Sequence, residues 1–192
     1  MRDLFAVPPV PGLTHAESFI NSGEEAALIS QIESLDLAPF RFQGWLGKRL
    51  TRSFGWRYDF DDASFVSTEP IPDWLLPLRE RAGALAKIPA DDFAHALVVR
   101  YDPGAGIGWH RDRPVFDQVV GVSLGAPATL RFRQRTATGF RRASVPLESR
   151  SAYLLTGEVR RDWEHSIAPG ETLRFSITFR SLSNLGRAKA AG

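Results

Sequence analysis

The chain contains no cysteine and one methionine, and its only lysines are Lys48, Lys87 and Lys189. The absence of cysteine excludes disulfide bonds, thiolate metal sites and cysteine nucleophiles. No run of about eighteen apolar residues is present, so no membrane span is expected. The first residues also lack the long apolar stretch of a signal peptide. From these absences we expect a cytoplasmic protein.

The composition is typical of a globular protein, with 43% hydrophobic and 24% charged residues in a chain of 192 and a formal net charge of +2. This length suits one domain with its own core, and we expect a monomer. Nearly all cations are arginine, whose planar guanidinium binds phosphate or carboxylate through paired hydrogen bonds. A genome rich in G and C would produce the same excess, so the positions of the arginines are more informative than their number.

Two helices are predicted in the first ninety residues or so. Ser22 can cap the first helix, which has acids in its opening turn and stops at Pro39. The apolar face of this helix is predicted to contain Ala26, Leu28, Ile29, Ile32 and Leu35. The second helix is predicted from Asp73 to about Lys87, with Leu75, Leu78, Ala82 and Leu85 turned inward.

From residue 93 onward, short β-like runs alternate with turn clusters rich in glycine and proline. The runs cover residues 96–101, 118–124, 129–134, 152–156 and 173–180. Helices followed by many short strands predict an α+β fold whose core is a sandwich or a jelly-roll barrel.

The strongest chemical signal is His110-Arg111-Asp112, followed much later by His165. In an extended segment, residues i and i+2 point to the same side, so His110 and Asp112 can reach one ion together. Two imidazoles and one carboxylate form the facial triad that holds Fe(II) and leaves other coordination positions open. His95 has no acid two residues later and is not predicted as a ligand.

The last predicted strand alternates polar and apolar residues. Arg174, Ser176, Thr178 and Arg180 share one face, and phenylalanine or isoleucine occupies the other. Two guanidiniums on one face require anions if they are buried, and a dicarboxylic acid that chelates iron would supply one. By itself the pattern favours a half-exposed strand with a polar outer face. Together with the two histidines and the aspartate, it favours a co-substrate site.

With these residues in place, the chain resembles the AlkB family of Fe(II)- and 2-oxoglutarate-dependent dioxygenases. The resemblance runs from about residue 53 to 182 and is densest in the segments VVRYDPGAGIGWHRD, VGVSLG and RFSITFR. It implies a double-stranded β-helix, that is, a jelly-roll catalytic core over about residues 91–182. N-terminal helices and a nucleotide-recognition lid would occupy about residues 1–90.

The resemblance also implies a site. Fe(II) would be bound by His110, Asp112 and His165, 2-oxoglutarate by Tyr101 and Arg174, and Arg180 would lie beside both. O2 activation would be coupled to decarboxylation of 2-oxoglutarate, and hydroxylation of an N-methyl group would release formaldehyde and restore the base.

The chain departs from the family pattern near the co-substrate and the base. Val99 and Ser176 stand where some members have asparagine, and Pro114 stands where DNA-repair members often have an acid. Valine cannot donate the hydrogen bond that asparagine makes to the co-substrate. The oxygenase residues are intact, so these departures bear on the substrate.

Residues 40–60 interleave aromatic and cationic side chains, which suits a base stacked out of its strand and a phosphate backbone held by charge. We predict Trp56, Tyr58 and Arg52 as substrate contacts. Alternating arginines from Arg131 onward would add a basic face for nucleic acid.

The predicted function is oxidative demethylation of N-alkylated bases in DNA repair, with DNA favoured over RNA. The alternatives are the same chemistry on protein or another substrate, and a jelly-roll binding module without turnover.

Overall fold

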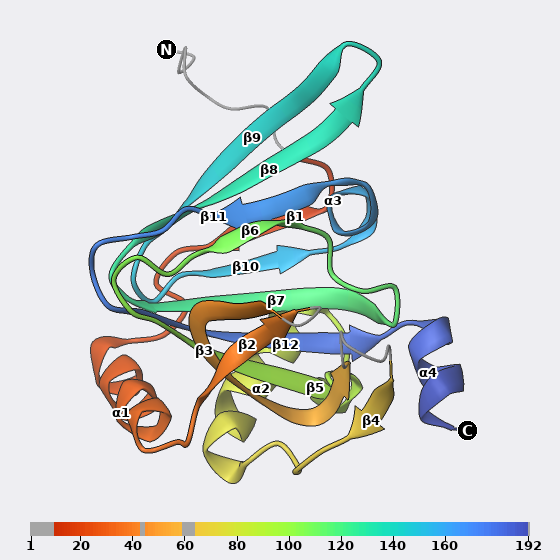
Figure 1. Ribbon diagram of the computed structural model, residues 1–192. Coiled ribbons are helices and arrows are strands. Elements are labelled where there is room, and N and C mark those ends of the chain that lie inside the picture. The colour runs from red at the N-terminus through yellow and green to blue at the C-terminus, as the bar shows by residue number, and fades with distance from the viewer. Residues whose placement is uncertain (1–9, 43–44, 59–63, 192) are drawn as a thin grey trace.

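The computed structural model describes residues 10–42, 45–58 and 64–191. Most of the irregular segment predicted for the first twelve residues lies outside these ranges. The core consists of two antiparallel sheets, one of eight strands and one of four (Figure 1). No helix in the described ranges is long and apolar enough to cross a membrane.

The chain from β5 to β12 passes back and forth between the two sheets. The larger sheet has the order β1 (Leu13–Ala16), β10 (Ala152–Leu155), β7 (Phe116–Gly125), β12 (Arg174–Leu182), β5 (His95–Tyr101), β3 (Trp45–Tyr58) and β2 (Ala38–Phe42), and β4 (Phe65–Ser67) pairs with β3. The smaller sheet has the order β6 (Ile107–His110), β11 (Glu164–Ile167), β8 (Ala128–Thr136) and β9 (Gly139–Leu147). This arrangement is the predicted double-stranded β-helix.

Helices cover the outer face of the larger sheet, below it in Figure 1. They are α1 (Ser22–Glu33) and α2 (Leu76–Ala86), the latter preceded by the single turn η1 (Asp73–Leu75). Leu28, Ile32, Leu78 and Ala82 join buried residues of the sheet in the largest core cluster. The short elements η2 (Ala90–Asp92), α3 (Gly157–Asp162) and α4 (Asn184–Ala190) complete the helices of the described chain.

Strand β12 separates the core under the helices from the interior of the barrel. Phe175, Ile177 and Phe179 pack in the core cluster, and the alternate polar side chains from Arg174 to Arg180 line the interior cavity. Both faces are buried along most of the strand. The polar face is therefore not the outer face of a half-exposed strand, and its buried groups need polar partners inside the barrel.

The first helix differs from its prediction at both ends. Asn21, not Ser22, is the N-cap: its side chain accepts a hydrogen bond from Glu24 N at 2.9 Å, and the Glu24 carboxylate accepts one from Asn21 N at 2.8 Å. The helix ends at Glu33 with Ser34 as its C-cap, and Pro39, which was predicted to stop it, lies inside β2.

The buried face of α1 also differs from the prediction. Ala26 is exposed and Glu25 is buried, although an apolar face predicted the reverse. Glu25, Leu28 and Ile32 follow the i, i+3, i+7 spacing of one helix face, so geometry places the acid against the sheet. Its burial depends on hydrogen-bond partners from the loops at the end of the barrel.

Strands β1 to β4, β6, β9 and β11 lie outside the runs that the sequence patterns predicted. β2 and β3 correspond to the predicted lid, and they extend the larger sheet beside β5. Gly55 has φ +77°, and a Cβ there would lie 2.0 Å from the Ala94 carbonyl oxygen. This bend lets β3 pair with β5 as far as Gly55 and with β4 from Trp56 onward.

The buried Glu25 generates a stability prediction. Its carboxylate accepts hydrogen bonds from the Ser149 hydroxyl, from Gly125 N at 2.9 Å and from Arg150 Nη1 at 2.9 Å. We expect Glu25→Gln to lower the free energy of unfolding by about 1–2 kcal/mol at neutral pH in urea titrations. Glu80→Gln, at an exposed position on α2, should change it little.

The pH dependence of this difference follows from the same contacts. Burial raises the pKa of Glu25, but the hydrogen bonds from Ser149, Gly125 and Arg150 together lower it by more than burial raises it. The net pKa is therefore below the usual 4.5. The stabilisation is therefore complete above the unfolded pKa and disappears as pH falls through the folded pKa. Equal stability losses for Glu25→Gln at neutral and strongly acidic pH would contradict this assignment.

Candidate active site

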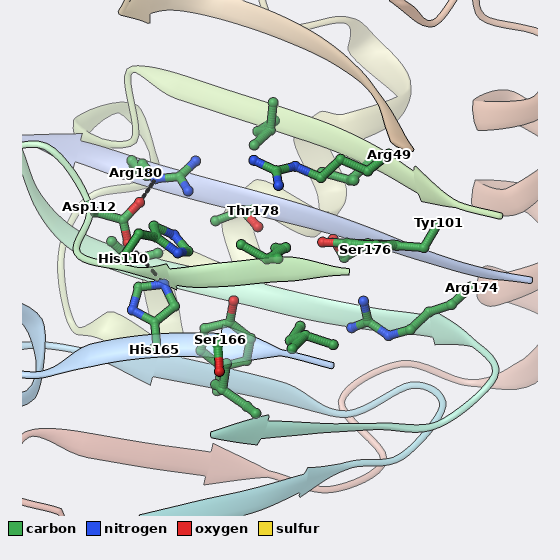
Figure 2. A pocket seen from close by; sticks show the side chains of 17 residues that line it. Arg49, Tyr101, His110, Asp112, His165, Ser166, Arg174, Ser176, Thr178 and Arg180 are labelled. Carbon is green, nitrogen blue, oxygen red and sulfur yellow. Dashed lines mark hydrogen bonds and ion pairs between the residues drawn. The ribbon is translucent and has the colours of Figure 1, made fainter. Parts of the chain in front are cut away.

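Three predicted metal ligands converge inside the barrel. His110 ends β6 and is the register partner of His165 on β11, and Asp112 follows β6 by two residues. Their ligand atoms lie within 4.8 Å of one another, and the two imidazole centroids are 4.3 Å apart. Figure 2 shows the three side chains turned toward one another from different segments. The pairing of β6 with β11 thus brings together residues more than fifty positions apart.

The protonation states of these side chains suit a metal ion. Burial and the neighbouring His110 lower the pKa of His165 to about 3, and burial also lowers the pKa of His110. Both rings are therefore neutral at physiological pH and have lone pairs for coordination. Burial raises the pKa of Asp112, but Arg180 and the two histidines together lower it by more than burial raises it. The net pKa is below the usual value, so the carboxyl is ionised. Asp112 Oδ2 is buried and has no hydrogen-bond partner among the described residues, as expected for an atom that binds a cation.

Arg180 holds the other oxygen of Asp112. Its Nε donates to Asp112 Oδ1 at 2.8 Å, and the two side chains are only 11% and 6% exposed. Behind it, His95 Nδ1 lies 3.4 Å from Arg180 Nη1. Burial and the charge of Arg180 keep the pKa of His95 well below its usual value, so the neutral ring accepts this hydrogen bond. His95, not predicted as a ligand, thus positions Arg180.

Arg160 of α3 fixes the loop that carries Asp112. Its buried guanidinium donates to the backbone carbonyls of Asp112, Arg113 and Phe116 at 3.2, 2.7 and 2.6 Å. Buried carbonyls without partners are costly, so these bonds hold the loop in one path. No motif pointed to Arg160, because its partners are backbone atoms 44 to 48 residues earlier.

The other end of the cavity suits a carboxylate. Arg174 Nη2 donates to Ser123 Oγ at 3.2 Å, but Arg174 Nε and Nη1 are buried without a partner in the described chain. The guanidinium lies 4.9 Å from the Tyr101 ring centroid, and the Tyr101 hydroxyl is 3.4 Å from Ser176 Oγ. Buried guanidinium N–H groups without a partner suit a carboxylate, which accepts charge-assisted hydrogen bonds. These residues fit a carboxylate of 2-oxoglutarate, as the triad fits a ferrous ion.

Tyr153 forms another wall of the cavity and was not predicted. It is the register partner of Gly121, where a Cβ would lie 2.3 Å from the Tyr153 ring, so glycine makes room for the tyrosine. Burial, with a smaller effect of Tyr101, raises the pKa of Tyr153 to about 12, and its hydroxyl is neutral. Val99 also lines the cavity.

Strand β3 adds Arg49 to the cavity wall. The sequence placed this residue only within the aromatic and cationic segment. Thr51 pairs with Val99, which faces the cavity, whereas Arg52 pairs with Val98, which faces the core under the helices. Alternation along β3 therefore turns Arg49 toward the site and Arg52 away from it.

The three predicted substrate contacts do not line the cavity. Arg52 donates to both carboxylate oxygens of Glu69 at 2.8 Å, so its charge is already paired. Trp56 stacks on Phe65 with centroids 5.0 Å apart, and Tyr58 joins Phe65 in a small cluster against the loop after the metal ligands. Trp56 and Tyr58 flank the site, and their role in substrate binding stays a prediction. Arg52 has no structural support for such a role.

Comparison with known proteins identifies the family. The family model of the 2OG-Fe(II) oxygenase superfamily matches residues 40–180. The tRNA (carboxymethyluridine(34)-5-O)-methyltransferase ALKBH8 of Mus musculus is 28% identical over 187 residues, covering 92% of this chain and 27% of that protein. The probable RNA/DNA demethylase ALKBH6 of Danio rerio is 27% identical over 158 residues, covering 79% and 62%. The chain spans less than two thirds of the length of these curated relatives.

Two solved structures share the fold. OsALKBH1 superposes with a TM-score of 0.70 at 18% identity, covering 90% of this chain and 98% of that one. A Pseudomonas putida prolyl-4-hydroxylase gives a TM-score of 0.63 at 14% identity, covering 90% and 93%. At these identities the likeness concerns the fold alone. From the family match and the triad, the chain belongs to the 2OG-Fe(II) oxygenase superfamily, whose members use Fe(II), 2-oxoglutarate and O2, and within it the chain is similar to AlkB-like proteins.

Proposed function

We propose that this dioxygenase oxidatively demethylates N-alkylated bases in nucleic acid, with DNA repair as its role. The observation that carries the nucleic-acid assignment is a basic, aromatic hairpin beside the triad. The oxygenase family match and the complete triad favour turnover over a binding module without it. The names of the relatives mention tRNA as well as RNA and DNA, so the two nucleic acids are tested side by side.

The proposed roles follow from the cavity. His110, Asp112 and His165 hold Fe(II), and Arg174 with Tyr101 holds 2-oxoglutarate. Bound together, the metal and the co-substrate supply O2 activation and oxidation of a C–H bond. The protein keeps the Asp112 carboxylate ionised through Arg180, keeps both imidazoles neutral, and surrounds the reacting groups with buried side chains.

The hairpin of β8 and β9 extends past the triad. Glu164, the first residue of β11, pairs with Arg133, so the hairpin beyond Arg133 projects past β11 and the adjacent ligand His165 (Figure 1). Arg135 and Arg142 are exposed on it, and no carboxylate of the described chain forms an ion pair with either. Both arginines lie on the face of the smaller sheet that carries Glu164, opposite the face of His165, and their guanidiniums are suited to phosphate where the hairpin extends past the triad.

Aromatic side chains accompany these charges. The Phe140 ring lies 4.7 Å from the guanidinium of Arg133, 5.2 Å from that of Arg135 and 5.5 Å from that of Arg142. On β6, Trp109 lies 4.6 Å from Arg133, which also pairs with Glu164. A surface that combines cations with aromatic rings matches the backbone charge and the base faces of a single strand. This supports a polynucleotide over a protein side chain as the substrate.

A turnover assay tests the proposed function. DNA and RNA oligonucleotides with single methylated bases are incubated with Fe(II), ascorbate and 2-oxoglutarate, and mass spectrometry measures the restored base. We expect demethylation with release of formaldehyde, none with Asp112→Ala, and normal turnover with the exposed control Asp117→Ala. Succinate formation without any restored base would refute the nucleic-acid substrate while leaving the oxygenase intact.

The role of Arg174 is tested by the co-substrate. A lost charge-assisted bond of about 1.5–3 kcal/mol corresponds to a roughly ten- to hundredfold rise in the KM for 2-oxoglutarate in Arg174→Gln. Arg174→Lys should recover part of the loss, because it keeps the charge without the fork. The measurement is succinate production without a nucleic-acid substrate. An unchanged KM would assign the unpaired N–H groups of Arg174 to a different ligand.

The hairpin is tested by the salt dependence of binding. Each lost phosphate contact lowers the slope of log affinity against log salt by about 0.7–0.9, so Arg135→Gln with Arg142→Gln should lower it by roughly 1.5. Fluorescence anisotropy with a labelled oligonucleotide measures the slope. The matched pair Arg187→Gln with Lys189→Gln, exposed on α4, should leave it unchanged. Equal slopes for the hairpin variant and the wild type would remove the hairpin from the interface.

A further inference from the structure

Arg49 is the cavity arginine whose charge the oxygenase chemistry leaves unmatched. Within the described chain, Arg49, Arg174 and Arg180 line the cavity. Arg180 is paired with Asp112 at 2.8 Å. Arg174 has buried N–H groups that suit a carboxylate of 2-oxoglutarate. Arg49 forms no ion pair with a described carboxylate, and its guanidinium lies 3.8 Å from the Phe40 ring centroid.

The charges of the cavity point to one more anion. Three guanidiniums face one carboxylate, that of Asp112, and imidazoles bind a metal as neutral ligands, so the lining side chains carry an excess of two positive charges. A ferrous ion and a 2-oxoglutarate dianion cancel each other, so that excess remains in the loaded site. Unbalanced charge in a largely buried cavity is unfavourable, and an anionic ligand relieves it.

Arg49 lies at the end of the cavity that holds Arg180 and the metal ligands. Burial lowers the pKa of Arg49, the nearby Tyr101 opposes this effect, and Arg180 adds to it. Arg49 and His110 line the same cavity. Figure 2 shows its guanidinium reaching into the cavity on the side of Arg180, apart from the guanidinium of Arg174. Arg49 therefore lies within electrostatic range of the metal ligands, and it comes from the strand that forms the predicted lid.

We propose that Arg49 forms an oxyanion subsite beside the metal, which binds a phosphate or carboxylate group of the substrate. The two carboxylates of 2-oxoglutarate are accounted for by the metal and Arg174, so neither is left for Arg49. A guanidinium stacked on an aromatic ring keeps its edge free for a phosphate or carboxylate. Where the oxyanion is a phosphate of nucleic acid, the inference rests on the proposed function.

The experiment first uses inorganic phosphate as a probe that does not depend on the substrate. Phosphate is titrated calorimetrically into protein loaded with Mn(II) and 2-oxoglutarate. We expect Arg49→Gln to weaken phosphate binding by about tenfold or more, since a charge-assisted bond is lost. Arg49→Lys should be intermediate, and Arg187→Gln, an exposed change of equal charge on α4, should match the wild type.

The second arm titrates 2-oxoglutarate into the Mn(II) protein. Its affinity should change by less than about twofold in Arg49→Gln, which also demonstrates that the variant has a folded site. A tenfold loss of 2-oxoglutarate affinity would assign Arg49 to the co-substrate and overturn the proposal. Phosphate binding that is equal in Arg49→Gln and wild type would overturn it as well.

The third arm uses the methylated oligonucleotide, whose KM should rise in Arg49→Gln by more than kcat falls. If the wild type demethylates no oligonucleotide but binds phosphate through Arg49, the proposed function fails and the oxyanion subsite stands. If the wild type demethylates the oligonucleotide and Arg49→Gln has the same KM, Arg49 is not a substrate contact.

Discussion

The buried ion pair between Arg180 and Asp112 is the interaction on which the site depends. Burial alone would favour a protonated Asp112, which is a poor metal ligand. The guanidinium of Arg180 keeps the carboxylate ionised and turns one oxygen away, so the other faces the two histidines. Arg180 belongs to the larger sheet and Asp112 follows a strand of the smaller sheet, so the pair also joins the two halves of the barrel. Removing one partner of such a pair typically costs about 3–5 kcal/mol.

A polar cavity inside a small protein is tolerated because most of the apolar core lies elsewhere. The main cluster fills the space between the larger sheet and the helices α1 and α2, on the opposite side of β12 from the site. A second cluster around Phe132 and Trp163 lies between the sheets and packs beside the cavity. One face of β12 packs in the apolar core and the other lines the active-site cavity, which explains the strict alternation of apolar and polar residues along this strand.

Sequence patterns recovered the features that depend on local spacing. The spacing of two positions from His110 to Asp112 and the alternation from Arg174 to Arg180 each predict which side chains share a side. They did not recover His95, whose role appears only beside Arg180. Arg160 acts on backbone carbonyls far away in the chain. Such contacts between distant elements leave no periodic signal, and so no window of the sequence contains them.

Alternation along β3 places Arg49 and Arg52 on opposite faces of the strand. The sequence analysis grouped the cations of the lid together because it assigned no strand there. Once β3 pairs with β5, Arg49 faces the cavity and Arg52 pairs with Glu69 on the other face. A one-residue change of register exchanges the two faces, so only the pairing of the strands decides which cation belongs to the site.

By itself, the sequence determined the ligand types, their order and the polarity of the last strand, because these depend on composition and on the period of an extended chain. The tertiary structure alone decided which distant groups meet: His110 opposite His165, Arg160 on the loop of Asp112, and Arg49 inside the barrel. The physical reason is that sheet register and loop path are set by contacts across the whole barrel, whereas spacing constrains only neighbours along one strand.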